Sequence, residues 1–135
     1  MQIMLDTNVL LSIAAFKSRN MGAMLGWICQ EQQLVLSTYV VDECYEVVRR
    51  KKPALIPALD RFFEALPFEM VHTPEILPRH EWFTIRDRAD EKVLYSAIAS
   101  DVDVLITGDK DFDDISIEKP DIMTPRQFME KFIFM

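Results

Sequence analysis

Residues 102–112 read VDVLITGDKDF, and they contain the clearest strand signal in the sequence. The first six of these residues are mostly apolar and β-branched, and Gly108 ends the run, so we predict a buried strand over Val102–Thr107. Immediately upstream, apolar residues recur at helical spacing and predict a helix from Asp90 to Ser100. A helix that leads directly into a buried strand is typical of an α/β protein.

The rest of the chain repeats this alternation of short apolar runs and longer amphipathic segments. We predict further strands over Gln2–Leu5, Leu34–Leu36, Phe68–Val71 and Asp121–Met123. We predict further helices over Val9–Phe16, Met21–Gln32, Tyr39–Arg50, Pro53–Leu66 and from Pro125 onward, with a loop at Pro74–Pro78. This order implies a mostly parallel sheet that helices cover on both faces.

Length and composition narrow the class of protein. The 135 residues fit a single domain over residues 1–135, and 50% of them are apolar, which is enough for a core. No run approaches the roughly 20 apolar residues of a membrane span, and Asp6 and Asn8 interrupt the N-terminal apolar run. We therefore expect a cytoplasmic protein, and we expect Cys29 and Cys44 to be reduced thiols inside it.

The formal net charge is −7, which argues against a general nucleic-acid coat. It does not argue against an enzyme that holds cations, because bound divalent metal reverses the local sign of a carboxylate cluster.

Four acidic residues stand where such a cluster could form. Asp6 follows the first predicted strand, and Asp109 follows the strand that ends at Thr107. Glu43 lies in the second turn of the helix after the second strand, and Asp90 opens the helix before Val102. Because ligands bind beyond the carboxyl ends of parallel strands, these acids are candidates for one site. Repelling carboxylates need protons or cations between them, and their hard oxygens suit Mg²⁺ or Mn²⁺.

Each of these acids also has an ordinary structural explanation. Asp6 or Asn8 could simply cap a helix. Asp90 and Glu91 could complement a helix dipole, and Glu43 could lie on a solvated helix face. Asp109 and Asp111 could be turn residues.

At these residues the sequence resembles a PIN domain. The matching segments are Leu5–Leu10 (LDTNVL), Ser37–Glu43, and Arg86–Leu94 followed by Asp103–Phe112. Together they span nearly the whole chain. Asp-Thr-Asn alone is weak evidence, but ahead of Thr-Gly-Asp-Lys-Asp-Phe in this order it is specific.

The resemblance implies a Rossmann-like three-layer α/β/α sandwich with a central mostly parallel sheet, and Mg²⁺- or Mn²⁺-dependent cleavage of RNA. The residues that match the family's metal ligands are Asp6, Glu43, Asp90 and Asp109, with Asp111 an occasional fifth. Asn8 and Thr107 match small polar residues that hold water or orient a ligand, and Glu91 is a reserve for Asp90. Short bacterial members resemble VapC-like toxins of toxin–antitoxin pairs, so a small antitoxin, an RNA substrate and a homodimer are expected.

Outside the acids, few residues suggest a role in substrate binding. We expect Arg86 and Arg88 to contact RNA, whereas the basic run Arg49–Lys52 is typical of a solvated helix end. His72 and His80 stand in no catalytic pattern. Six aromatic residues could pack in the core, which we favour, or they could form a dimer face or a groove for a partner helix. They are Phe62, Phe63, Trp82, Phe83, Phe132 and Phe134.

Two other functions remain open from the sequence. A phosphotransferase or phosphatase could use Asp6 as a covalent nucleophile, but the position that usually carries its second acid is Asn8. A PIN-like scaffold could bind RNA or a partner without cutting, although such members would be expected to lose one of the acids. The sequence favours the endoribonuclease and does not name its RNA target.

Overall fold

The computed structural model describes residues 1–134 and contains a five-stranded, all-parallel sheet in the order β3-β2-β1-β4-β5. Its strands are β1 (Gln2–Leu5), β2 (Gln33–Ser37), β3 (Glu69–Val71), β4 (Val104–Ile106) and β5 (Asp121–Met123). The strand order reverses at β1, which pairs with β2 on one side and with β4 on the other. A mostly parallel α/β sheet was predicted from the alternation of strands and helices, and it is confirmed; the strand order was not predicted.

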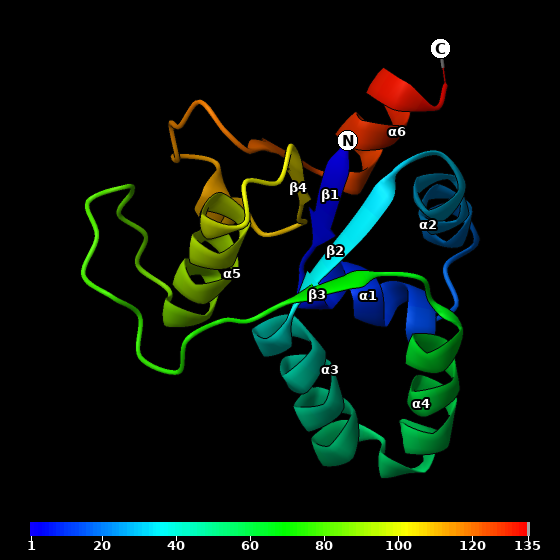
Figure 1. The fold of residues 1–135 in the computed structure, drawn as a ribbon. Helices are drawn as coiled ribbons and strands as arrows, with labels where there is room; N and C mark the ends of the chain where they lie inside the picture. The colour runs from blue at the N-terminus through cyan, green and yellow to red at the C-terminus, as the bar shows by residue number, and fades with distance from the viewer. Residues whose placement is uncertain (135) are drawn as a thin grey trace.

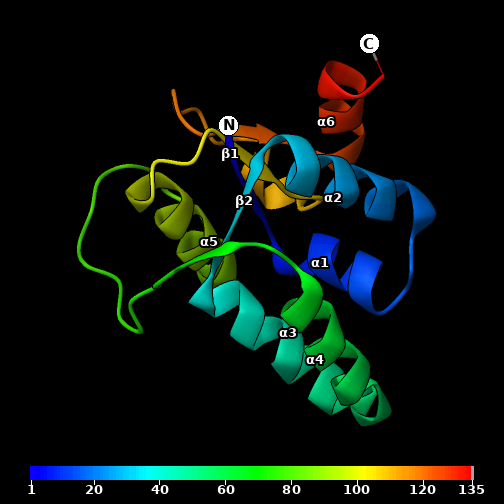
Figure 2. The same cartoon turned by 45° about the vertical axis from the view of Figure 1, so that its right-hand side comes forward.

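Six α-helices flank this sheet over the described residues. They are α1 (Thr7–Ala14), α2 (Arg19–Glu31), α3 (Thr38–Lys51), α4 (Ile56–Ala65), α5 (Arg88–Ala99) and α6 (Pro125–Phe132), with 3₁₀ turns η1 (Pro53–Leu55) and η2 (Lys110–Phe112). Figure 1 shows α5 on one side of the sheet and α1 and α2 on the other. In Figure 2, α3 and α4 run side by side, in agreement with their packing contacts. This is the predicted three-layer arrangement.

The strands at the centre of the sheet are apolar because helices cover both of their faces. Ile3, Met4 and Leu5 of β1 are fully buried, as are Leu105 and Ile106 of β4. The prediction of core packing holds for Phe62, Phe63, Phe83 and Phe132, which pack against this core, whereas Trp82 and Phe134 are exposed. Both cysteines are free thiols, Cys44 buried and Cys29 partly so. None of the helices described is long and apolar enough to cross a membrane.

Several helices begin or break at residues that differ from the sequence prediction. The first helix starts at Thr7 rather than Val9, because the Asp6 carboxylate caps it by accepting from the Val9 N–H. The helix predicted over Pro53–Leu66 is split into η1 and α4, because Pro57 has no N–H to donate to the Pro53 carbonyl. The helix predicted from Asp90 starts at Arg88, one residue after its cap.

The carboxyl ends of the strands share one edge of the sheet with the beginnings of α1, α3 and α5, at the lower side of Figure 1. The register places Leu5 of β1 opposite Ile106 of β4, and the Asp6 N–H donates to the Ile106 carbonyl at 3.2 Å. Residues that directly follow β1 and β4 are therefore neighbours.

Candidate functional site

Asp6 lies at the centre of this edge and is almost completely buried, with 6% of its surface exposed. One carboxylate oxygen accepts from the Val9 N–H at 3.1 Å, and the other accepts from the Thr107 hydroxyl. Burial raises the pKa of Asp6, and the negative charges of Asp109 and Glu43 raise it further, while the Thr107 hydrogen bond opposes this. Those charges reach Asp6 only because the three carboxylates are close together.

Glu43 approaches Asp6 from the second turn of α3. Its two carboxylate oxygens each accept a hydroxyl hydrogen bond, one from Thr7 on α1 and one from Tyr39 on its own helix at 2.8 Å. Tyr39 and Glu43 are four residues apart, so they lie on the same face of α3. The carboxylate of Glu43 is thus held in one orientation by groups from two helices.

Asp90, the third residue of α5, is 9% exposed. Its Oδ2 atom is buried and has no hydrogen-bond partner among the described residues. Burial, followed by the charges of Asp109 and Asp87, raises the pKa of Asp90 to about 8. A buried carboxylate oxygen without a donor is costly for a protein, and a cation would satisfy it.

Asp109 and Asp111 enter from the turn after β4. The Asp109 N–H donates to the Thr107 hydroxyl oxygen at 3.1 Å, and the Asp109 carboxylate accepts from the Asp111 N–H at 2.9 Å. Asp109 therefore does cap a short turn, as its ordinary structural explanation suggested. The capping leaves its negative charge next to Asp6 and Asp90.

One further acid belongs to this group and was missed in the sequence. Asp87 caps α5 by accepting from the N–H groups of Ala89 and Asp90, at 2.8 and 3.1 Å. One oxygen from each of Asp87, Asp90 and Asp111 lies within 4.8 Å of the others. The signal was the spacing Asp87-x-x-Asp90, with an N-cap acid one turn ahead of a candidate ligand. These donors are hard oxygens, and together with the unpartnered Asp90 Oδ2 they fit a divalent cation such as Mg²⁺ or Mn²⁺.

The comparisons with known proteins agree with this fold. The sequence profile of the PIN domain matches residues 2–111, which is well over half of the chain. The chain belongs to the PIN-domain family. A search of curated protein sequences gave no match.

Three solved structures similar to this PIN domain are of VapC or VapBC proteins. VapBC2 from Rickettsia felis, bound to a DNA fragment from its promoter, has a TM-score of 0.68 at 19% identity, covering 91% of this chain and 97% of that chain. VapBC-1 from nontypeable Haemophilus influenzae has a TM-score of 0.64 at 16% identity, covering 93% and 99%. VapC20 from Mycobacterium tuberculosis, a toxin that cleaves the sarcin-ricin loop, has a TM-score of 0.56 at 17% identity, covering 82% and 92%. At these identities the likeness shows the fold.

The predicted supporting residues of this PIN domain differ in where they lie. Thr107 is buried and bonded to Asp6. Asn8 is exposed and lines a groove with Leu11 and Phe16 instead. Glu91, the reserve for Asp90, is half-buried and lines a cavity between α3 and α5.

The basic residues also separate into two groups. Arg86 and Arg88 are exposed and line the same cavity as Glu91. This cavity lies next to the acidic cluster, which comprises Asp6, Glu43, Asp87, Asp90, Asp109 and Asp111. Arg49 and Arg50 are exposed in the last turn of α3, where they favour the helix dipole. The histidines are not part of the cluster: the ring of His80 packs against Trp82, Phe83 and Tyr95.

Proposed function

We propose that this PIN domain is a metal-dependent endoribonuclease that hydrolyses RNA phosphodiester bonds. The proposed ligands of Mg²⁺ or Mn²⁺ are Asp6, Glu43, Asp90 and Asp109, with Asp111 as a further ligand. The observation that carries the proposal is a continuous group of carboxylates around two buried acids. Asp109, Asp87 and Asp111 lie near Asp90, whose buried Oδ2 has no hydrogen-bond partner among the described residues, and Asp109 and Glu43 lie near Asp6.

Each part of the cluster has a separate task in this proposal. Thr107 and the Val9 N–H orient Asp6, and Thr7 and Tyr39 orient Glu43, so the carboxylates do not have to reorganise during the reaction. When bound, the cation supplies positive charge against the phosphate oxygens and acidifies a water molecule for attack. Arg86 and Arg88 hold the RNA backbone at the rim, where the net negative charge of the chain would otherwise repel it.

The arrangement also bears on the covalent alternative. Each oxygen of Asp6 accepts one hydrogen bond and keeps a lone pair that could bind a cation or attack phosphorus, so these bonds do not distinguish the two roles. Asn8, at the position of the usual second acid, is exposed and lines a different groove. The missing second acid favours a role for Asp6 as a cation ligand in hydrolysis.

We further propose that the chain is the toxin of a cytoplasmic toxin–antitoxin pair, inhibited by a small antitoxin, and that it forms a homodimer. Support comes from the similar structures, two of which are VapBC complexes and one of which is a toxin that cleaves the sarcin-ricin loop. Co-purification of the chain with the product of a neighbouring gene, and light scattering of the isolated chain, test these two points separately.

The test of the nuclease compares the wild type with Asp6→Asn on structured and unstructured RNA. Each is incubated with Mn²⁺, with Mg²⁺ and with EDTA. We expect cutting that needs metal and that Asp6→Asn abolishes while circular dichroism shows an unchanged fold. The matched control is Asp42→Asn, since Asp42 is an exposed acid on α3 outside the cluster.

Undiminished cutting by Asp6→Asn would refute the proposed site. No cutting by either protein across a broad RNA panel would favour the alternative, a PIN domain that binds RNA or a partner without cleavage. Calorimetric titration with Mn²⁺ then separates a domain that binds metal from one that has lost the site.

A further inference from the structure

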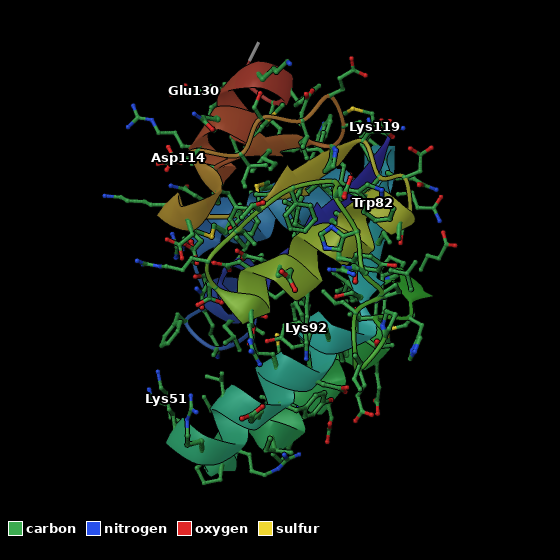
Figure 3. All side chains as sticks on the ribbon, turned by 90° about the vertical axis from the view of Figure 1, so that its left-hand side faces the viewer. Lys51, Trp82, Lys92, Asp114, Lys119 and Glu130 are labelled. Carbon is green, nitrogen blue, oxygen red and sulfur yellow. The ribbon has the colours of Figure 1, made fainter. Side chains whose placement is uncertain are left out.

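A cavity of about 600 Å³ opens between α3 and α5, beside the acidic cluster. Its lining comes from α3, from α5 and from the irregular segment between β3 and α5. Tyr39 lies on α3 and Lys92 on α5, with the Lys92 ammonium 5.1 Å from the centre of the Tyr39 ring. Figure 3 shows Lys92 on the side of α5 that faces α3. This cavity has no part in holding the metal in the proposal above.

Three of the residues that line the cavity are basic. Arg86, Arg88 and Lys92 line it against the acids Glu75 and Glu91, which gives a local excess of positive charge in a chain of net charge −7. Within residues 1–134, none of these three cations forms an ion pair with an acidic side chain. These cations have no acidic partners and lie beside a carboxylate cluster. They are suited to an anionic ligand that extends from the cations to the cluster.

Part of the lining of the cavity is apolar. Ile76 and Leu77 follow β3 in the irregular segment, and Ile76 is 88% exposed. Tyr39 adds its half-buried ring. A large apolar side chain held in water beside cations gains free energy when a ligand with a flat apolar face covers it. A nucleotide offers such a base and, joined to it through the ribose, the phosphate that the cations bind.

Tyr39 joins the cavity to the cluster. Its ring lines the cavity, while its hydroxyl donates to Glu43 Oε2 at 2.8 Å. A group bound against the ring is therefore within one side chain of a proposed metal ligand. This continuity places the cavity next to the phosphate that would be cut.

We propose that this cavity is a subsite for one nucleotide of single-stranded RNA flanking the cut phosphate. Arg86, Arg88 and Lys92 contact the sugar–phosphate backbone, and Ile76, Leu77 and the Tyr39 ring contact the base and ribose. The subsite rests on the proposed nuclease function and adds where the RNA lies. Because apolar contacts accept any base, it contributes affinity more than sequence preference.

The test is fluorescence anisotropy with a short fluorescein-labelled single-stranded RNA in Mg²⁺, using Asp6→Asn as the parent so that the RNA stays intact. Lys92→Ala added to this parent removes one backbone contact. It should raise Kd about fourfold and reduce the slope of log Kd against log salt by about 0.7. Ile76→Ala should raise Kd about fivefold with little change in that slope. Since Ile76 is exposed, its substitution leaves the core untouched.

The matched control is Lys51→Ala, which removes an exposed lysine at the far end of the same helix as Tyr39. It should bind like the parent. Equal Kd values for the parent, Lys92→Ala and Ile76→Ala would overturn the subsite, as would a parent that does not bind the RNA at all. Cleavage by the wild type is scored separately. If the wild type cuts RNA but the variants bind it like the parent, the subsite alone is refuted. If the variants bind RNA more weakly but the wild type never cuts it, the nuclease alone is refuted.

Discussion

The hydroxyl of Thr107 donates a hydrogen bond to Oδ2 of Asp6, although 101 positions separate the two residues. The pairing of β1 with β4 brings them together, since each directly follows its strand. The Thr107 oxygen also accepts from the N–H of Asp109 at 3.1 Å. One hydroxyl thus connects two of the proposed metal ligands and fixes their spacing.

We expect Thr107→Val to weaken Mn²⁺ binding and RNA cleavage about 10- to 100-fold, the usual cost of losing a group that orients a metal ligand. Valine has nearly the shape of threonine, so the core is preserved while the donor to Asp6 is lost. Mn²⁺ titration by calorimetry and cleavage rates measure the two effects. Thr107→Ser keeps the hydroxyl and should remain close to the wild type. Equal loss in both variants would mean that packing, not the hydroxyl, matters at this position.

Tyr39→Phe tests the orientation of Glu43. The substitution removes the hydroxyl that donates to Glu43 and keeps the ring that lines the cavity. We expect kcat for RNA cleavage to fall about tenfold with KM nearly unchanged, because a ligand loses one of its two hydroxyl donors while RNA contacts remain. A rise in KM at constant kcat would place the hydroxyl in RNA binding instead.

The buried acids predict how the stability of the metal-free protein depends on pH. The pKa of Asp90 is raised from 3.8 to about 8, and that of Asp6 is raised as well. Between about pH 4 and pH 8 the folded protein therefore retains a proton that the unfolded chain has released. The free energy of unfolding falls as pH rises through this window, by up to about 1.4 kcal/mol per pH unit for one proton.

Thermal unfolding in EDTA from pH 5 to pH 8 measures this decline. Asp90→Asn should flatten it, whereas Asp42→Asn, which removes an exposed acid, should not. Saturating Mn²⁺ should raise the Tm most at pH 8, because the cation takes over the role of the proton. A Tm of the EDTA-treated wild type that stays constant over this range would contradict the burial of an ionisable Asp90.

Much of this site followed from the sequence because it depends on strand ends. Asp6 and Asp109 each follow an apolar run, and parallel pairing alone makes such positions neighbours. Asp90 was predicted at the same edge because its helix leads directly into the strand that precedes Asp109. The Gln2–Leu5 and Asp121–Met123 strands were predicted with the bounds that the structure has.

The features that escaped prediction depend on how helices and loops pack. That Thr7 would meet Glu43 depends on the angle between α1 and α3, which no local pattern encodes. The cavity beside Tyr39 exists because the irregular segment after β3 places Ile76 near α5. Asp87 was overlooked because a helix cap and a metal ligand use the same residue type, and the sequence cannot distinguish the two.

Two substitutions of Asp87 separate its contribution as a cap from its charge. Its Oδ1 accepts from the N–H groups of Ala89 and Asp90 in the first turn of α5, and one of its oxygens lies within 4.8 Å of oxygens of Asp90 and Asp111. Asp87→Ala loses both roles and should lower the free energy of unfolding by about 1 kcal/mol. Asp87→Asn keeps a side chain that caps helices equally well, so its stability should stay within about 0.5 kcal/mol of the wild type.

Both variants should nevertheless bind Mn²⁺ more weakly than the wild type, because each removes one negative charge from the edge of the cluster. Chemical denaturation in EDTA reports the cap, and calorimetric titration with Mn²⁺ reports the charge. If Asp87→Asn binds Mn²⁺ with wild-type affinity, Asp87 is a helix cap alone, and the cation is held by the buried acids without it.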